Sequence, residues 1–419
     1  HMAPLSLTAS KWEKEGPSNQ VALSSQAWFG LLKGLDNQLA SASSGIVGSV
    51  TAMDGRHGNR GNKFNSLACG ATGVTKSYAF ERENIRCRAL DMHPELLIDA
   101  HAAAKLIEND MFNAGGEVEI GIDRDERRWT MVCFAEDLVE DIQPLQDDDL
   151  WVVSGGGSGV TAASIIGVAN ASKNSNATFI LLGRSKLIEE TSDWLSWTDE
   201  EMNDRKMALR EELMAESESG KVTMVDWNNA WMKFTRSKDI YQTIHEIEST
   251  GNKAEYHPAD VTDSSAIKAA VNGRIVTGIV HGAGLEESKL VADKEWSKFD
   301  LIVRVKVDGW KALVASTDEN LRFACAFTSV AGRFGNGGQT DYAAANSILD
   351  AEMARLTASG KCRAVAIGWT GWRDVGMATR GSIEAVFEAA GIETLAVEDG
   401  VDIFVNEALA GGKRRVIAC

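Results

Sequence analysis

The chain has 419 residues, enough for two to three domains or one large α/β unit. Its 44% hydrophobic and 25% charged residues exclude a disordered chain, and no run reaches the roughly 18 apolar residues of a membrane span. The formal net charge of -17 would repel phosphate backbones. We therefore expect no nucleic-acid partner and no membrane partner.

Six scattered cysteines include no Cys-x-x-Cys pair. This pattern favours neither a disulfide framework nor a zinc site, so we expect no metal and a reducing, cytoplasmic setting. The opening His1-Met2 resembles a cloning remnant. We therefore expect the chain to be a piece of a longer protein.

The first part of the chain contains a diverged copy of a later part. Residues 51–59 match residues 328–336, and residues 86–90 match residues 361–365. The two spacings differ by only two residues. We interpret this as two related α/β subdomains, residues 1–149 and 150–419, with the chemistry in the second.

One glycine-lysine string in the first part superficially resembles an ATP-binding loop. It covers residues 70–77, and its lysine is Lys76. That motif needs a glycine directly before the lysine, whereas Val74 and Thr75 intervene here. We therefore expect no ATPase site.

From Trp151 onward, short apolar strands alternate with helical stretches, which is typical of a parallel doubly wound sheet. The predicted strands are residues 150–153, 178–182, 254–258, 278–283, 322–329 and 363–367. Residues 143–149 end in three aspartates, which favours a solvated linker before the first of these strands.

A charged insertion at about residues 186–250 fits no regular βα unit. We expect a solvated helix over residues 199–218 and an amphipathic helix over residues 239–250. A charged segment of this kind is usually an exposed face. Whether it shapes a binding site stays open at this point.

A glycine-rich loop follows the first strand of the second subdomain and leads into a helix. Glycines there allow backbone N–H groups to approach a pyrophosphate at the positive end of the helix. The position predicts a dinucleotide site. The loop residues assigned to it are Ser154, Gly155, Gly157, Ser158, Gly159 and Val160.

The end of the second strand indicates which dinucleotide binds. An acidic residue there would bind the ribose hydroxyls of NAD, but this chain has Arg184 and Ser185. A guanidinium and a hydroxyl suit a 2′-phosphate, so we expect NADPH. Further cofactor-binding residues are predicted at Asp260 and Val261, which would bracket the adenine, and at the small residues Gly282, Ala283 and Gly284.

Four residues suit carbonyl reduction by hydride transfer. Tyr342 and Asn346 lie one helical turn apart, and Ser329 ends a predicted strand. The reaction needs an acid for the developing alkoxide and a donor to polarise the oxygen. Tyr342 is the candidate acid if a cation lowers its pKa, and Lys306 is the candidate cation.

Together these motifs resemble the short-chain dehydrogenase/reductase superfamily, and within it the ketoreductase domains of polyketide and polyunsaturated-fatty-acid synthases. The superfamily usually has lysine four residues after the tyrosine, where this chain has Asn346. The synthase ketoreductases share this exchange and carry the lysine on the preceding helix, where Lys306 stands. The polyunsaturated-fatty-acid type is favoured by Thr161, by the insertion after residues 182–187 and by residues 333–342.

The resemblance implies an α/β fold with two Rossmann-like subdomains. The N-terminal one is truncated, cofactor-free and structural, while the C-terminal one is doubly wound and catalytic. Ala52 stands where the second copy has Ser329, and Asn65 stands where it has Tyr342. The first copy therefore lacks the groups for the reaction.

The resemblance also implies the reaction. NADPH reduces a 3-ketoacyl chain carried on an acyl carrier protein, within a synthase that has neighbouring domains. Tyr342 donates the proton and Ser329 polarises the carbonyl, while Lys306 and Asn346 tune the tyrosine and relay protons. Residues 285–287 (Leu-Glu-Glu), with Phe334 eight residues before the tyrosine, favour a 3R product.

Two alternatives remain open from the residues alone. One is a stand-alone reductase of a free small ketone, and the other is a silent scaffold that binds NADPH or a carrier protein. In the family, a lid meets the substrate near Trp369, Trp372 and Gly376-Met377. Arg373 and Arg380 are weak candidates for docking an acidic carrier protein.

Overall fold

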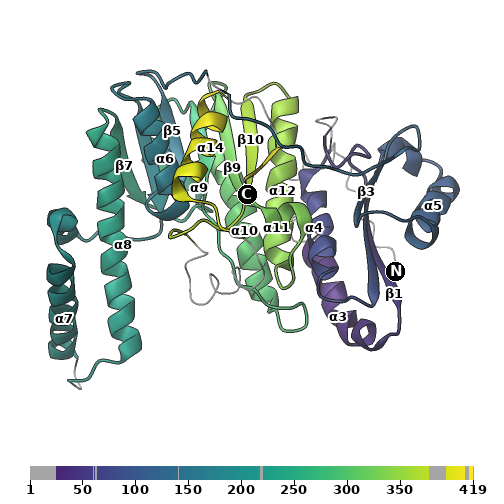
Figure 1. The fold of residues 1–419 in the computed structure, drawn as a ribbon, viewed down its shortest axis with the longest axis horizontal. Coiled ribbons are helices and arrows are strands. Elements are labelled where there is room, and N and C mark those ends of the chain that lie inside the picture. The colour runs from purple at the N-terminus through teal and green to yellow at the C-terminus, as the bar shows by residue number, and fades with distance from the viewer. Residues whose placement is uncertain are drawn as a thin grey trace.

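The computed structural model describes residues 25–59, 61, 64–139, 141–217, 220–376, 393–410 and 415–418. In these residues the chain forms two β-sheets, each flanked by helices (Figure 1). The first sheet comprises β1 (Gly45–Thr51), β2 (Ile85–Met92), β3 (Glu119–Ile122) and β4 (Arg128–Trp129), in that order. Its first three strands are parallel, and β4 is antiparallel to β3.

The second sheet has seven parallel strands in the order β11-β10-β9-β8-β5-β6-β7. They are β5 (Leu150–Ser154), β6 (Thr178–Gly183), β7 (Lys253–Pro258), β8 (Gly278–His281), β9 (Phe323–Ser329), β10 (Arg363–Trp369) and β11 (Arg415–Ala418). The chain leaves β5 toward β6 and later returns to β8 on the other side of β5, so the strand order reverses at β5. The predicted α/β doubly wound fold is confirmed, and β11 is a strand that the sequence analysis missed.

Helices cover the faces of both sheets (Figure 1). The helices beside the first sheet are α3 (Ala27–Ser41), α4 (Cys69–Tyr78) and α5 (Ala100–Glu108). Those of the second are α6 (Gly159–Ala171), α8 (Met224–Ser249), α9 (Ser264–Val271), α10 (Trp296–Val314), α11 (Val330–Phe334), α12 (Thr340–Ala358) and α14 (Val397–Leu409), and α7 (Asp199–Glu216) packs on the outside of α8. No helix in the described part of the chain is both long and apolar enough to cross a bilayer.

Helices α4 and α12 join the two halves, lying side by side between the sheets (Figure 1). A Cβ at Gly73 of α4 would lie 2.5 Å from the Ala343 carbonyl oxygen and 2.8 Å from Cα of Ala344. Glycine is therefore needed at position 73 for the close approach of two helices. The glycine-lysine string at residues 70–77 is the body of this helix, which explains its glycines without a phosphate.

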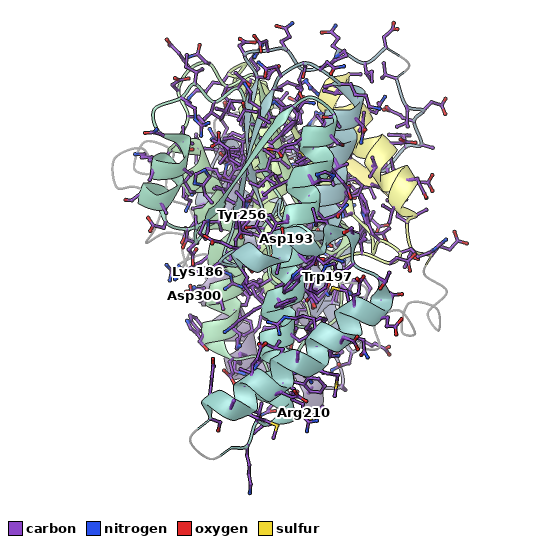
Figure 2. The ribbon with its side chains drawn as sticks, turned by 90° about the vertical axis from the view of Figure 1, so that its left-hand side faces the viewer. Lys186, Asp193, Trp197, Arg210, Tyr256 and Asp300 are labelled. Carbon is purple, nitrogen blue, oxygen red and sulfur yellow. The ribbon has the colours of Figure 1, made fainter. Side chains whose placement is uncertain are left out.

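The insertion forms a helical hairpin, with α7 packed across α8 and Arg210 on α7 (Figure 2). Helix α8 begins fifteen residues before the predicted residue 239, because Thr223 caps it by accepting from the Asp226 N–H. The Trp227 indole donates to the Lys206 carbonyl, and the Arg210 guanidinium lies 5.4 Å from the Trp227 ring centroid. Aromatic and cationic side chains thus hold the two helices together.

The segment before β5 differs in part from the predicted solvated linker. Most of residues 143–149 are exposed, but Asp149 is buried. Its carboxylate pairs with Arg322 at 2.6 Å and accepts from the Thr277 hydroxyl at 2.6 Å. Leu145 packs against the core of the second sheet. The segment is therefore attached to that sheet rather than free in solvent.

Candidate active site

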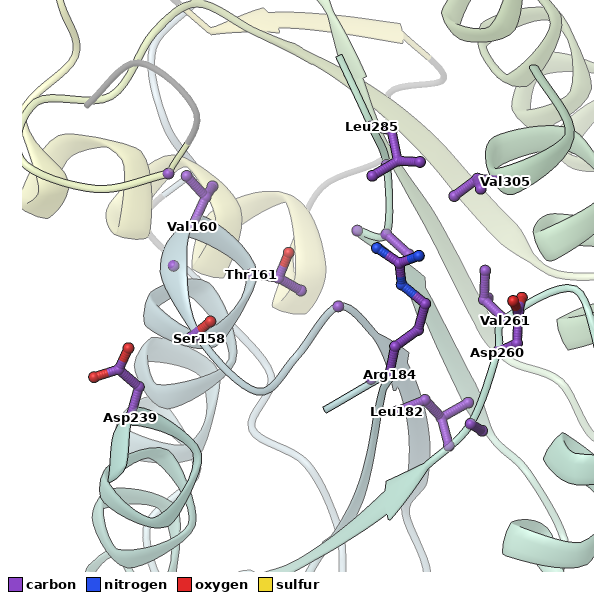
Figure 3. A pocket seen from close by; sticks show the side chains of 18 of the residues that line it. Ser158, Val160, Thr161, Leu182, Arg184, Asp239, Asp260, Val261, Leu285 and Val305 are labelled. Carbon is purple, nitrogen blue, oxygen red and sulfur yellow. The ribbon is translucent and has the colours of Figure 1, made fainter. Parts of the chain in front are cut away.

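A cavity of about 930 Å³ opens at the carboxyl ends of β5, β6 and β8 (Figure 3). This is the point where the strand order reverses, and open α/β sheets bind their ligands at such switch points. Ten of the thirteen predicted cofactor-binding residues line it: Gly155, Ser158, Gly159, Val160, Arg184, Asp260, Val261, Gly282, Ala283 and Gly284.

The loop after β5 has the backbone geometry of an anion site. Gly155 has φ +73°, and a Cβ there would lie 2.9 Å from the Ala283 nitrogen. Ser158 is the N-cap of α6, but its side chain makes no capping hydrogen bond. The first-turn N–H groups of this 13-residue helix have no side-chain cap, so they can bind phosphate oxygens.

Thr161, in the first turn of α6, packs against Gly282 after β8. A Cβ at Gly282 would lie only 2.1 Å from the Thr161 hydroxyl oxygen. The larger residue on α6 is therefore matched by a glycine after β8. Thr161 itself lines the cavity, which the sequence analysis did not predict.

Arg184 extends into the middle of the cavity from the end of β6 (Figure 3). Hydrogen bonds from Thr262 lower the pKa of Asp260, and the positive charges of Arg184 and Arg304 lower it further. Two guanidinium groups therefore face this end of the cavity. Arg304, from α10, is a second candidate phosphate ligand that sequence reasoning missed, because nothing in its own helix marks it.

Three predicted cofactor residues do not line the cavity. Ser154 is fully buried, Gly157 packs against Ile240 of α8, and the Ser185 carbonyl accepts from the Tyr256 hydroxyl at 2.8 Å. Ser154 and Gly157 were predicted from their place in the glycine-rich loop, and Ser185 from its hydroxyl at the strand end; their contact with a cofactor stays a prediction. Each supports the shape of the loop or the strand end.

The Ser154 hydroxyl forms a hydrogen bond with a buried histidine, His281, that the sequence analysis did not identify. The His281 Nε2 lies 2.8 Å from the Lys306 carbonyl oxygen, so Nε2 carries the proton and donates. Burial and the Lys306 charge lower the pKa of His281 to about 3. Its Nδ1 is therefore unprotonated and accepts from the Ser154 hydroxyl at 2.7 Å. This pair connects the glycine loop with the helix that carries Lys306.

One wall of the cavity comes from the insertion. Asp239, Gln242 and Thr243 of α8 line it, and the Thr243 hydroxyl donates to the Gly157 carbonyl at 3.1 Å. Burial raises the pKa of Asp239, which lies beside Ser158 in Figure 3. The second insertion helix, α8, therefore borders the cavity. From the sequence alone it was open whether the insertion shapes a binding site.

The structure brings three of the four predicted catalytic residues together. Tyr342 is 9% exposed, and Asn346 directly below it on α12 is fully buried. Burial raises the pKa of Tyr342 to about 12, with a further rise from Glu286, while the side chains of Asn346 and Ser329 act in the opposite direction. The phenol is therefore protonated at neutral pH and can act as an acid.

Hydrogen bonds fix the orientation of these side chains. The Asn346 amide donates to the Tyr342 carbonyl at 2.8 Å, and its Oδ1 is a buried oxygen with no hydrogen-bond partner among the described residues. Ser329 caps α11 by accepting from the Ala331 N–H at 3.1 Å, and its hydroxyl also acts on the Tyr342 phenol.

Lys306, the predicted cation, lies behind the cavity wall, and its effect on the pKa of Tyr342 stays a prediction. Its ammonium donates to the Phe327 carbonyl at 2.7 Å and would lie 3.2 Å from a Cβ at Gly284, directly behind the cavity wall. Burial lowers the pKa of Lys306 to about 8. Lys306 is thus placed by α10 at the site but directed toward β9.

Residues 285–287 begin at the cavity wall beside Tyr342. Leu285 lines the cavity and packs beside Tyr342, and Glu286 accepts from the Gln339 amide at 3.0 Å. Phe334 ends α11 and is half exposed.

The two tryptophans expected near the acyl chain are core residues instead. Trp369 and Trp372 are buried, with their ring centroids 5.0 Å apart, and neither lines the cavity. Arg373 is exposed and its N–H donates to the Leu395 carbonyl. Met377, Arg380 and most of the expected lid lie outside the described residues.

Comparison with known proteins shows which family and which relatives the chain is similar to. The family model of the KR domain matches residues 151–374, just over half of the chain. One polyunsaturated fatty acid synthase protein of Thraustochytrium sp. is 29% identical over 341 residues, and polyketide synthase PksN of Bacillus subtilis is 25% identical over 370 residues. These alignments cover 78% and 85% of this chain but only 12% and 6% of the relatives.

Solved ketoreductase structures share the fold. A ketoreductase domain from the bacillaene assembly line has a TM-score of 0.69 at 22% identity, and the alignment covers 98% of this chain and 88% of that one. A ketoreductase from the first module of phoslactomycin biosynthesis in Streptomyces sp. HK803 also has a TM-score of 0.69, at 19% identity, covering 100% and 87%.

Proposed function

Because the chain belongs to the KR domain family, we propose that it is a ketoreductase that uses NADPH to reduce a 3-ketoacyl chain on an acyl carrier protein. The similarity to a polyunsaturated fatty acid synthase and to polyketide synthases supports a place among the neighbouring domains of such a synthase. The observation that carries the activity is the buried, protonated Tyr342 with Ser329 and Asn346 acting on its hydroxyl. Residues 1–149 would be the structural subdomain and 150–419 the catalytic one.

The residues around the cavity fit NADPH. The uncapped N-terminus of α6 and Gly155 with its positive φ would hold the pyrophosphate, and Arg184 with Arg304 would bind the 2′-phosphate. Val261 and Asp260 border the end where the adenine would lie. Bound NADPH supplies the hydride for the reaction.

Tyr342 acts as the general acid in this proposal. The hydroxyl of Ser329 donates a hydrogen bond to the substrate carbonyl oxygen, and the Tyr342 phenol gives its proton to the alkoxide that develops there. The raised pKa of Tyr342 keeps the proton on the phenol until the alkoxide forms. General acid catalysis of this kind contributes about 10²–10⁴-fold in rate.

Asn346 and Lys306 support the return of the proton to Tyr342. The unpartnered Oδ1 of Asn346 is a buried acceptor next to the tyrosine, suited to hold a relaying group. Lys306, with its pKa lowered to about 8, can exchange a proton near neutral pH. We therefore assign these two residues to the proton relay, while the Asn346 side chain also acts to lower the pKa of the phenol.

The stereochemical proposal is a 3R alcohol, supported by Leu285 in the cavity wall next to Tyr342. The cytoplasm is the proposed location, and it is supported by the free thiols of the described cysteines: Cys69, Cys87, Cys133, Cys325 and Cys362.

The test is consumption of NADPH with a 3-ketoacyl thioester by the wild-type protein and by Tyr342→Phe. We expect NADPH to be used in preference to NADH, and we expect the variant to lose about 10²–10⁴-fold in kcat while still binding NADPH. Chiral analysis of the product should give the 3R alcohol. Binding of NADPH without turnover by the wild-type protein on a carrier-bound substrate would instead indicate a silent scaffold.

A further inference from the structure

The segment between Ser329 and Tyr342 is held by a helix of the other half of the molecule. Lys76, near the end of α4, is 4% exposed, and its ammonium donates to the carbonyls of Gly332 at 2.8 Å and Arg333 at 2.9 Å. Both carbonyls lie in the single turn of α11, whose last carbonyl groups have no partner within the helix. Lys76 therefore caps the short helix that begins at Ser329.

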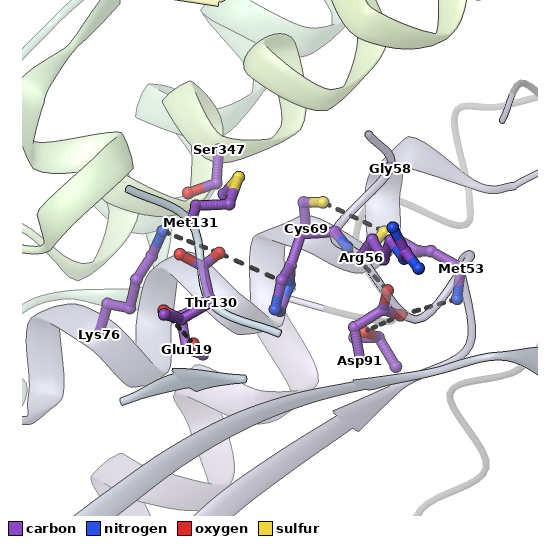
Figure 4. A network of polar contacts seen from close by, with 12 residues as sticks. Met53, Arg56, Gly58, Cys69, Lys76, Asp91, Glu119, Thr130, Met131 and Ser347 are labelled. Carbon is purple, nitrogen blue, oxygen red and sulfur yellow. Dashed lines mark hydrogen bonds and ion pairs between the residues drawn. The ribbon is translucent and has the colours of Figure 1, made fainter. Parts of the chain in front are cut away.

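A buried ion pair holds the lysine in place. Glu119 of β3 lies 3.3 Å from the Lys76 ammonium (Figure 4). Glu119 also pairs with the Arg333 guanidinium. Burial raises the pKa of Glu119, but Lys76, His57 and Arg333 more than offset it and leave this pKa well below its usual range. The carboxylate is thus ionised and attaches α11 to the first sheet through two cations.

The next residues of the segment lie directly against the backbone of α4. Gly335 has φ +83°, and a Cβ there would lie 2.6 Å from the Lys76 carbonyl oxygen. The Asn336 N–H donates to the Ser77 hydroxyl at 3.2 Å. The turn between α11 and α12 is therefore shaped by contact with α4.

Glu81, just beyond α4, connects this turn with the loop on the other side of Tyr342. One carboxylate oxygen accepts from the Gly338 N–H at 3.1 Å, and the other accepts from the Val291 N–H at 2.7 Å. The Lys289 N–H in turn donates to the Gly338 carbonyl at 2.9 Å. One side chain thus fixes both segments that flank the start of α12.

We propose that Lys76 and Glu81 are positioning residues for the reaction, which hold α11 and the turn before α12 so that Ser329 and Tyr342 meet the same carbonyl oxygen. This inference rests on the proposed ketoreductase function. Neither residue lines the cofactor cavity, so each acts only through the backbone that it binds. The first half of the chain thereby contributes two side chains to a site whose reacting groups all belong to the second half.

The experiment compares Glu81→Ala, Glu81→Gln and Lys76→Met with the wild-type protein. Since a misplacement of about 1 Å can cost 10²-fold, we expect kcat to fall by about 10- to 100-fold in Glu81→Ala and Lys76→Met, with KM for NADPH within about twofold of wild type. Glutamine keeps one of the two acceptors, so Glu81→Gln should recover part of the loss. The matched control is Glu83→Ala, because Glu83 is exposed two residues further on.

Far-ultraviolet circular dichroism and NADPH fluorescence would show that each variant is folded and binds cofactor. A wild-type kcat in folded Glu81→Ala would overturn the proposal, as would equal falls in kcat and in NADPH affinity. Absence of ketoreductase activity in the wild-type protein would instead contradict the proposed function itself, so the two failures are distinguishable.

Discussion

The units β1–α4–β2 and β9–α12–β10 have the same parallel strand–helix–strand topology, but their loops after the first strand differ. In the first unit, Asp91 stands opposite Thr51 and accepts hydrogen bonds from the Thr51 hydroxyl and from the N–H groups of Met53 and His57. In the second unit, the register pairs Thr328 with Gly368, which has no side chain. One loop is closed by a buried carboxylate and the other is not.

The two units also differ at the positions of the proposed catalytic residues Ser329 and Tyr342. Ala52 follows β1, whereas Ser329 ends β9, and Asn65 uses its side chain to cap a short helical turn by accepting from the Leu67 N–H at 3.0 Å. The same topology therefore serves two purposes. In the proposed mechanism, the unit with Ser329 and Tyr342 binds and protonates the substrate, while the other supplies helix α4 as a support.

Substitution of Gly73 tests how closely the two units depend on each other. In Gly73→Ala the new Cβ would lie 2.5 Å from the Ala343 carbonyl oxygen, so α4 must move away from α12. We expect the free energy of unfolding to fall by about 2 kcal/mol, within the range for overpacking. Urea denaturation would measure it.

The matched control is Gly34→Ala on α3, where a Cβ meets nothing within 4 Å. Alanine is favoured over glycine in a helix, so this variant should gain about 0.5–1 kcal/mol. A neutral or stabilising Gly73→Ala would mean that the two units pack more loosely than the structure shows.

A smaller effect concerns acid stability, because the first unit buries a neutral histidine, His57, and the second unit contains no histidine. Burial lowers the pKa of His57 in the first unit to about 4, with Lys76, Arg333 and Arg415 adding to the shift and Glu119 opposing it. The unfolded chain takes up a proton at this histidine below its ordinary pKa of 6.5, whereas the folded chain does not. Stability is therefore fully present above pH 6.5 and falls as the pH drops toward 4.

The variant His57→Asn should reduce this pH dependence by up to about 1.4 kcal/mol per pH unit. Asparagine tolerates the left-handed backbone of this position, where φ is 54°. Urea denaturation of both proteins across this pH range is the measurement. Parallel curves would indicate that His57 titrates normally in the folded protein, and that the first unit is more open to water than the structure shows.

Much of the fold could be predicted from the sequence, because buried parallel strands form apolar runs bounded by glycine and charge. Six strands of the second sheet were identified in this way, and the residues predicted at their ends include ten of the 25 that line the cavity. Strand β11 is only four residues long and is defined by its pairing with β10, so local pattern did not reveal it. The first half of α8 was missed because tertiary packing of its tryptophans on α7 outweighs local pattern.

The candidate site was predicted less completely, for a physical reason. Loop position indicates which residues can approach a cofactor, but not which way each side chain points. Ser154 lies in the predicted loop yet binds His281, and Lys306 lies on the predicted helix yet donates to Phe327. Lys76 and Glu81 are distant in sequence from Tyr342, so only the packing of α4 on α12 reveals them.

The most direct test replaces Ser329 and Tyr342 of the second unit with Ala and Asn, the residues that the first unit has at the matching positions 52 and 65. The double variant Ser329→Ala with Tyr342→Asn should still fold and bind NADPH, although the loss of the Ser329 cap and of the buried Tyr342 ring should lower its free energy of unfolding. Its NADPH-dependent reduction of a 3-ketoacyl thioester should fall at least about 10²–10⁴-fold, since the general acid is gone. Retention of turnover within a few-fold of wild type would show that Ser329 and Tyr342 do not carry the reaction.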